Sequence, residues 1–378
     1  MVLVSALFLA LSYDPYGEAE PQSFVQLKPR TIPILAYHRF SADIHSRLHH
    51  LDTTPQSFQE QLDYLKQQGY QTVSLDVFLQ ENKGKPLPEK PVIITIDDGF
   101  KSTYTVAFPM LKKMGFSATA FICPQYIGSA PALMTWSQCQ EMAAAGFSIQ
   151  SHSYIHGHLS LPRRGEDAFG YLDRVSRELQ RSKSKIEDKI RMPVRHLAYP
   201  YGDYDLAVES LAVKSGYRTI CLATRGTNTP WTNPVRLERN FINSKVTFNK
   251  FKGFLDVLYL SAMPIAPQEA SVIKRVPLVL KARLLRMDRL DLSTVQMYLG
   301  ERSYPTVVDE KTGQVSCAIP FLPRFGFHTA SIVAREKLSQ KTSMYSWTFA
   351  VRRKSDVSMF NKLLKLMNTS EVIPSAAP

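Results

Sequence analysis

The sequence of 378 residues lacks the series of long hydrophobic runs that is typical of a polytopic membrane protein. An apolar segment opens the chain, MVLVSALFLALS, but it is too short to span a bilayer and has no basic residues before it. Its length matches a signal-peptide core, with a plain hydrophobic N-terminus as the alternative. We therefore predict an export signal or short anchor within residues 1–30, and a protein that is periplasmic, at the cell surface or membrane-anchored.

Cysteine is also scarce, with four residues that follow no disulfide or metal spacing: Cys123, Cys139, Cys221 and Cys317. Cys123 and Cys221 stand in apolar, strand-like runs, which predicts buried thiols. The chain has no zinc-finger spacing, no RNA-binding aromatic signature and no Walker loop, so we expect no nucleic-acid partner. The net charge of +13 instead suits an anionic surface or polymer.

One pattern recurs between residues 31 and 225: a helix-period segment, a glycine, an aromatic residue and a short β-branched run. FQEQLDYLKQQGYQTVSL is one copy, and the four glycines are Gly69, Gly115, Gly146 and Gly216. A glycine there can take the left-handed conformation that closes a helix. Thr135 and Gln138 predict a capping box. Helices that alternate with short apolar strands predict βαβ units around a parallel sheet.

Seven strand-like segments give almost enough strands for a closed barrel. In such folds the functional residues follow the carboxyl ends of the strands. This places five residues on one rim: His38, Asp97, Asp98, His152 and Tyr201.

The chemistry of that rim favours a metal site. Asp97 and Asp98 end the apolar run VIITI, and buried carboxylates are costly unless they are paired or bind a metal. His152 and His156 are four residues apart, as in a metal-binding pair. Two histidines and one carboxylate are typical of catalytic zinc or iron centres with open positions.

These segments resemble the NodB-type polysaccharide deacetylases (carbohydrate esterase family 4). TIDDG resembles the first family motif, HSYIH the second and AYPYG the third, and the resemblance covers residues 31–245. ILAYHRF, FQEQLDYLKQQGYQTVSL and MTWSQCQEMAAAGFSIQSHS resemble the branch that acts on poly-N-acetylglucosamine. The implied fold is a distorted (β/α)7-type barrel.

The resemblance implies a role for each motif residue. Asp98, His152 and His156 would hold a divalent metal, expected to be zinc, with cobalt, nickel or iron as alternatives. Asp97 would be the general base that activates water. Tyr201, through its backbone N–H, and Pro200 would contact the substrate or the oxyanion. Trp136 is expected either to stack on a sugar or to pack in the core.

The sequence departs from the family at two positions. Ala198 stands where the family commonly has an arginine that orients the base, and Arg239 is our candidate replacement, with Arg195 as the alternative. The family's late Leu-His motif, which supplies the general acid, has no visible counterpart. His38 is the candidate acid and His158 the second choice; a structural role for His38 is an equal alternative.

We predict a deacetylase domain over residues 31–250 and a proline-rich linker over 251–289. Alternating segments from Leu290 predict a small antiparallel β-sandwich over 290–354, similar to bacterial immunoglobulin-like modules, followed by a tail over 355–378. Six basic residues within 274–289 are expected either to be a solvated face or to contact an envelope component or acidic polymer: Lys274, Arg275, Lys281, Arg283, Arg286 and Arg289.

The function predicted from these features is metal-dependent N-deacetylation of an exported or envelope polysaccharide that contains N-acetylglucosamine. Deacetylation of peptidoglycan or chitin oligomers is an alternative within the same chemistry. The alternative of a different class is a degenerate deacetylase fold that binds glycans without turnover, because the arginine and the late histidine are missing.

Overall fold

The computed structural model describes residues 30–43, 46–81 and 86–368. The predicted signal segment lies, up to residue 29, outside the described residues. Within the described residues, no helix combines the length and the apolar character needed to cross a membrane.

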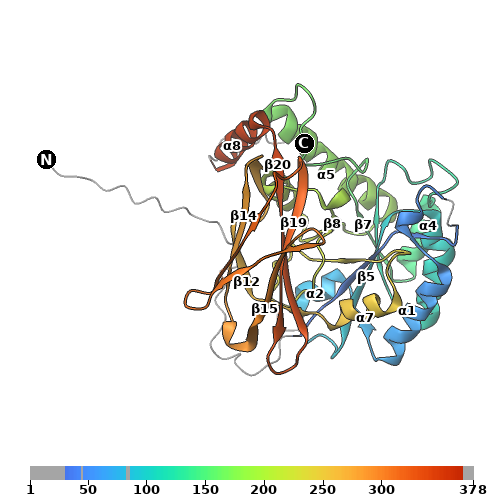
Figure 1. The fold of residues 1–378 in the computed structure, drawn as a ribbon. Coiled ribbons are helices and arrows are strands. Elements are labelled where there is room, and N and C mark those ends of the chain that lie inside the picture. Colours follow the sequence, from blue (N-terminus) through green and yellow to red (C-terminus); the bar gives the residue numbers. More distant parts are fainter. Residues whose placement is uncertain (1–29, 44–45, 82–85, 369–378) are drawn as a thin grey trace.

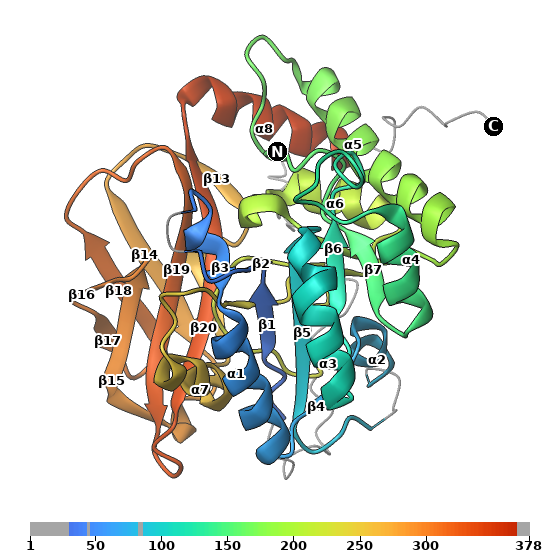
Figure 2. The same ribbon diagram turned by 90° about the vertical axis from the view of Figure 1, so that its right-hand side faces the viewer.

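A curled sheet of parallel strands forms the centre of the first part of the chain, with helices on its outside (Figure 2), and this confirms the predicted barrel-type fold. Its strands pair in the order β10, β1, β5, β6, β7, β8, β9, while β4 pairs only with β5. Their bounds are β1 (Ile34–Tyr37), β4 (Gln71–Thr72), β5 (Pro91–Asp98), β6 (Thr119–Ile122), β7 (Ser148–Ser151), β8 (His196–Ala198), β9 (Thr219–Cys221) and β10 (Asn240–Phe241).

The helices around this sheet are α1 (Pro55–Gln67), α2 (Leu75–Glu81), α3 (Phe108–Met114), α4 (Trp136–Ala144), α5 (Ala168–Ile190), α6 (Leu206–Lys214) and α7 (Phe248–Asp256). The four predicted helix-closing glycines all have positive φ. The capping box of Thr135 and Gln138 is present at the start of α4. Short elements complete this part: β2 (Arg39–Phe40), β3 (Asp52–Thr53), a π-helical turn at Thr103–Ala107, and 3₁₀ turns at His49–Leu51 and Pro200–Gly202.

Strand β5 is buried on both faces, as its sequence predicts. Val92, Ile94 and Ile96 pack in the core beneath the helices. Ile93 belongs to the core on the other face, together with Phe121. Because successive side chains of a strand alternate, Asp97 falls on the same face as Ile93 and enters the barrel interior.

The segment between β9 and β10 brings the two ends of the sheet together. Leu237 forms a parallel bridge with Cys221 of β9, and Arg239 donates a backbone hydrogen bond to Thr224. The chain then continues into β10, which pairs with β1. This segment was not among the predicted strands, and it carries Arg239 to the inside of the barrel.

The second part of the chain consists of two packed sheets around a separate core that contains Trp347 and Phe349. One sheet has the order β11, β20, β19, β15, β16, with β13 also paired to β20; the other has the order β12, β14, β18, β17. Their bounds are β11 (Leu258–Tyr259), β12 (Ala262–Ala266), β13 (Ser271–Lys274), β14 (Leu278–Leu284), β15 (Leu290–Leu299), β16 (Arg302–Tyr304), β17 (Val307–Asp309), β18 (Gln314–Ile319), β19 (Gly326–Glu336) and β20 (Thr342–Arg352). A 3₁₀ turn covers Met287–Arg289.

Most strand pairs of this second part are antiparallel, in agreement with the predicted sandwich, but β11 and β13 pair with β20 in parallel. Residues 258–284 form strands of the same two sheets. The domain boundaries at residues 30, 250, 289 and 354 stay predictions. All four cysteines are free and buried, which confirms the buried thiols predicted at Cys123 and Cys221.

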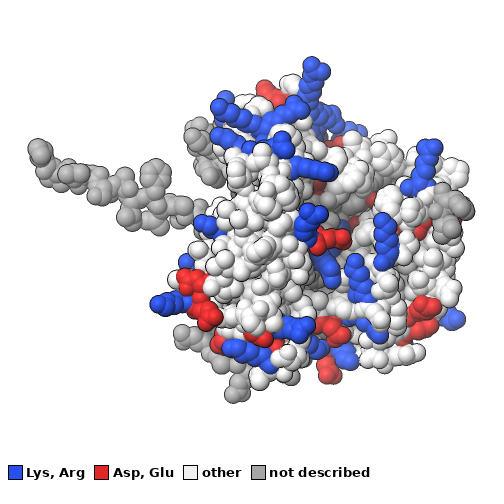
Figure 3. Space-filling model, viewed as in Figure 1, with Lys and Arg blue, Asp and Glu red and all other residues white. Residues whose placement is uncertain are grey.

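The sandwich lies alongside the barrel (Figure 1), and the chain then returns to the barrel. Helix α8 (Lys354–Asn368) contacts α5 and α6, and its Phe360 and Leu363 belong to the barrel core. Basic side chains gather near α8 in one view of the surface (Figure 3).

Candidate active site

Three barrel strands deliver the candidate residues to one rim. His38 follows β1, Asp97 and Asp98 end β5, and His152 follows β7. These strands run parallel in one sheet (Figure 2), so their carboxyl ends meet at the same edge. The structure therefore brings together the residues that the sequence places on one rim.

Asp98, His152 and His156 form a cluster suited to a metal ion. One ligand atom from each lies within 4.8 Å of the other two. The Nε2 atom of His156 lies 3.1 Å from Asp98 Oδ1, and that of His152 lies 3.4 Å from the same oxygen. This Asp98 oxygen is buried and makes no hydrogen bond of acceptable geometry. A cation between the three groups would satisfy it, so the residues fit a divalent metal.

A backbone contact fixes the imidazole of His152. Its Nδ1 atom lies 2.8 Å from the carbonyl oxygen of Ala198, an acceptor, and therefore carries the proton. Nε2 is then left with a free lone pair toward Asp98, as a metal ligand requires. Burial acts to lower the pKa of His152, but the charges of Asp97 and Asp98 outweigh it and raise this pKa.

The backbone of this rim is unusual at four residues other than glycine, one of which is Ser153, with a φ of 59°. Asp98, His156 and Tyr201 have φ values of 76°, 54° and 61°, in the left-handed region that residues other than glycine rarely adopt. Such conformations cost free energy and persist where the surroundings hold them, often at functional sites. The turn at Asp98 separates its side chain from that of Asp97.

Asp97 forms a buried ion pair with Arg239. Nη1 of Arg239 donates to Asp97 Oδ1 at 2.8 Å and also approaches Thr95 Oγ1 at 3.2 Å, while Nε donates to the carbonyl oxygen of Leu222. The side chains of Asp97 and Arg239 are 1% and 4% exposed. Burial acts to raise the pKa of Asp97, but the charges of Arg239, His152 and His38 outweigh it and hold this pKa below its ordinary value.

The alternative arginine lies elsewhere. Arg195 is exposed and lies 3.4 Å from Asp76, at the opposite end of β8 from the rim. Ala198, at the family's arginine position, is buried in the barrel interior. Arg239 thus contacts the Asp97 carboxylate, which the short methyl side chain of Ala198 cannot pair with.

His38 lies on the other side of Asp97. Its Nε2 atom is 3.8 Å from Asp97 Oδ2, and its buried Nδ1 atom has no hydrogen-bond partner. The ring packs against Phe241, with ring centroids 4.6 Å apart. Burial outweighs the neighbouring carboxylates and lowers the pKa of His38.

His158 belongs to a separate group of side chains. Its Nδ1 atom lies 2.6 Å from Asp203 Oδ2, and its ring stacks on Tyr201 at 4.2 Å. Tyr201 in turn contacts the ring of His156. Asp203 was not among the residues predicted from the sequence, although it directly follows the PYG segment.

The three candidates for substrate contact lie at different depths. Pro200 is buried at the start of the 3₁₀ turn, and Tyr201, the next residue, is 60% exposed. Trp136 begins α4 and packs, partly buried, against the barrel core. The arrangement as a whole brings three possible metal ligands, an ionised carboxylate and a histidine within a few ångströms of one another, which suits hydrolysis by an activated water.

Comparison with known proteins agrees with this geometry. Residues 84–220 match the sequence model of the family described as polysaccharide deacetylase. YxkH of Bacillus subtilis (strain 168) is 32% identical over 194 residues, which cover 50% of this chain and 64% of that protein. The poly-beta-1,6-N-acetyl-D-glucosamine N-deacetylase of Escherichia coli (strain K12) is 28% identical over 198 residues, which cover 43% of this chain and 29% of that enzyme. The chain therefore spans less than two thirds of either relative.

The fold has a solved counterpart. The Streptococcus pyogenes deacetylase PplD in complex with acetate superposes with a TM-score of 0.54 at 24% identity, over 60% of this chain and 99% of that one. This likeness establishes the barrel fold. The match to the polysaccharide deacetylase model covers residues 84–220, a part of this barrel.

Proposed function

We propose that this protein removes N-acetyl groups from an exported or envelope polysaccharide that contains N-acetylglucosamine, in a metal-dependent hydrolysis that releases acetate. The observation that carries the proposal is the juxtaposition of two groups on one rim. The Asp98, His152 and His156 cluster supplies a metal site, and the buried Asp97–Arg239 pair lies directly beside it.

Asp98, His152 and His156 would hold the metal, for which we propose zinc, with cobalt, nickel or iron as alternatives. When bound, the metal would polarise the acetamide carbonyl and lower the pKa of the attacking water. The Ala198 carbonyl keeps the His152 ring in the tautomer that this task requires.

Asp97 would act as the general base. Arg239 holds the carboxylate in place and keeps it ionised, so that it can accept the proton of the attacking water. The base needs one free lone pair directed at the site, and Asp97 Oδ2, the oxygen that faces His38 and His152, is the candidate.

His38 would deliver a proton to the leaving amine. Because its pKa is lowered, a protonated His38 gives up its proton readily. Its distance of 3.8 Å from Asp97 allows a proton taken from water to be passed on through a small movement. The backbone N–H of Tyr201, beside His156, would contact the oxyanion.

The substrate class comes from the relative named for poly-beta-1,6-N-acetyl-D-glucosamine and from the family match. The export signal predicted within residues 1–30 would place the protein with a polymer outside the cytoplasm. We also propose that the basic segment 274–289 contacts an acidic envelope component.

Acetate release from acetylated amino-sugar polymers tests the proposal. Asp97→Asn removes the base and nearly preserves shape, so kcat should fall by about 10²- to 10⁴-fold. Asp173→Asn, at an exposed helical ion pair with Arg177, is the matched control and should retain full activity. Full activity of Asp97→Asn, or metal binding without acetate release from any acetylated glycan, would contradict the proposal.

A further inference from the structure

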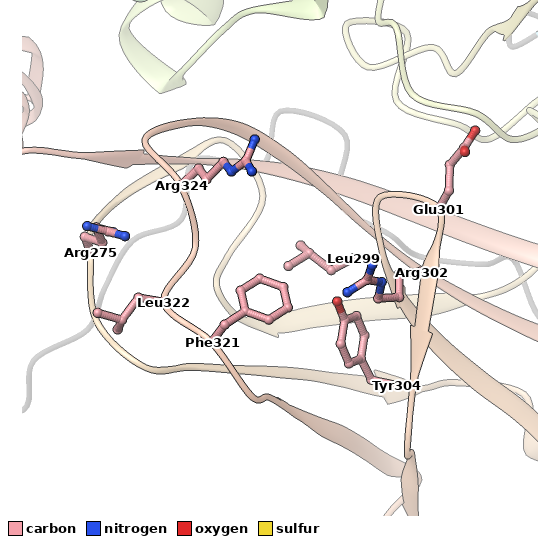
Figure 4. Close-up of a pocket in the computed structure, with 8 residues that line it drawn as sticks. All are labelled: Arg275, Leu299, Glu301, Arg302, Tyr304, Phe321, Leu322 and Arg324. Carbon is pink, nitrogen blue, oxygen red and sulfur yellow. The ribbon is translucent and has the colours of Figure 1, made fainter.

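A pocket of about 760 Å³ lies at one end of the sandwich, on the part of the chain that the deacetylation chemistry does not use. Its volume falls within the roughly 300–1,000 Å³ typical of small-ligand sites. Three loops or turns supply its walls, after β13, between β15 and β16, and between β18 and β19 (Figure 4).

Aromatic and aliphatic side chains form the middle of the pocket. The ring of Tyr304 is buried and lies 6.1 Å from the ring of Phe321, centroid to centroid. Phe321 and Leu322 are 44% and 47% exposed. An exposed flat ring next to a buried one offers a stacking surface to the apolar face of a sugar.

Three arginines surround this surface. Figure 4 shows Arg275 and Arg324 on one side of Phe321 and Arg302 on the other, while the Glu301 carboxylate points away from them. Within the part of the chain that the structure describes, the Arg302 and Arg324 guanidinium groups have no ion-pair partner.

Arg275 is held in place by its surroundings. Its Nε donates to the carbonyl oxygen of Pro323 at 2.9 Å, and its guanidinium lies 5.5 Å from the ring centroid of Phe325. Of the six basic residues predicted to form one patch, only Arg275 lines the pocket. Arg302 and Arg324 come from later strands and loops, so the fold and not the sequence gathers this charge.

The charge of the pocket selects its ligand. Guanidinium groups bind carboxylate and phosphate in a bidentate manner. A neutral acetylated polymer gives them no partner, and a deacetylated polymer carries ammonium groups that they repel. We propose that this pocket binds an anionic saccharide, a sugar ring that bears a carboxylate or phosphate. The buried Tyr304 ring beside the exposed Phe321 ring offers a stacking surface to a sugar, and this favours a sugar over an anionic membrane.

Isothermal titration calorimetry of the full-length protein tests this site. The probes are a polygalacturonate oligomer, an N-acetylglucosamine oligomer of equal length, inorganic phosphate, and phosphatidylglycerol vesicles. We expect saturable binding of the uronate oligomer that weakens with salt, and much weaker binding of the neutral oligomer. Arg302→Gln with Arg324→Gln should weaken uronate binding roughly tenfold or more.

Arg177→Gln, on an exposed position of α5 outside both the pocket and the basic segment 274–289, is the control and should leave binding unchanged. Acetate release should be the same in all three proteins. The proposal is overturned by equal affinity for the neutral oligomer, by uronate binding that the double variant retains, or by no saturable uronate binding. Preference for vesicles over the uronate would assign the pocket to a membrane, and preference for free phosphate would show that the sugar ring is not recognised.

Discussion

At the scale of single residues, the ion pair with Arg239 keeps Asp97, the proposed base, ionised. Both side chains are almost fully buried, so neither charge can rely on water. Removing one partner of a buried pair leaves the other charge uncompensated, at a cost of about 3–5 kcal/mol. Arg239→Met should therefore lower the free energy of unfolding by about this amount, as measured by chemical denaturation.

The same variant should also change the pH profile of acetate release. Without Arg239, burial dominates and the pKa of Asp97 rises, so the acid limb of the profile should move to higher pH. Asp97→Asn combined with Arg239→Met removes both charges and should recover much of the lost stability. An unchanged acid limb in Arg239→Met would show that Asp97 is not the base.

If His152 is a metal ligand as proposed, metal binding should depend on pH. In the metal-free protein the neighbouring carboxylates raise the pKa of His152, so this ring must lose a proton before it can bind a metal. Zinc affinity should consequently increase as the pH rises above about 6.5, the ordinary histidine value. Competition titrations with a chelating dye at several pH values measure this; affinity independent of pH would exclude His152 as a ligand.

At the scale of secondary-structure elements, the turn Pro200–Gly202 has little room for change. Gly202 has a φ of 68°, and an added Cβ would lie 2.5 Å from Cβ of Ala223. Gly202→Ala should therefore lower the free energy of unfolding by at least 1 kcal/mol and reduce activity through the displaced Tyr201.

Gly253 provides the matched control for this substitution. It lies within α7, has no positive φ, and an added Cβ would meet nothing within 4 Å. Gly253→Ala should raise stability by about 0.5–1 kcal/mol. Thermal unfolding and acetate release compare the two variants; equal effects would mean that the turn at Gly202 tolerates a side chain.

The elements that the sequence predicted best are those set by local rules. Helix ends marked by glycine and strand ends marked by polar residues appear where the pattern places them, because both depend on neighbouring residues. The closing segment around Arg239 depends on contacts with β9 and β1, which are distant in sequence. The sequence alone could not choose firmly between Arg239 and Arg195 as the partner of Asp97. Arg239 lies 142 positions from Asp97 along the chain, so no local pattern predicts their contact.

At the scale of the whole molecule, buried polar groups join the barrel to the sandwich. Glu238, beside the barrel, accepts a hydrogen bond from the backbone N–H of Ser346 in β20, and its other carboxylate oxygen has no partner. Glu269 accepts hydrogen bonds from Tyr204 of the barrel and Thr348 of the sandwich. The two parts should therefore unfold together.

Glu238 should make this stability depend on pH. Burial raises its pKa well above the ordinary value of 4.5. Above pH 4.5 the unfolded chain releases this proton and the folded one retains it, so stability should fall as the pH rises toward the folded pKa, by up to about 1.4 kcal/mol per pH unit. Glu238→Gln should flatten this dependence in denaturation curves; an unchanged slope would mean that Glu238 is ionised in the fold.

The measurement that tests the central claim most directly is acetate release from poly-β-1,6-N-acetylglucosamine by metal-stripped and zinc-reconstituted protein. The Asp98, His152 and His156 cluster is the site of the chemistry in this account. Removal of the metal should abolish acetate release, and added zinc should restore it. His156→Ala should release no acetate with or without zinc. Undiminished activity of the metal-free protein, or full activity of His156→Ala, would contradict the account.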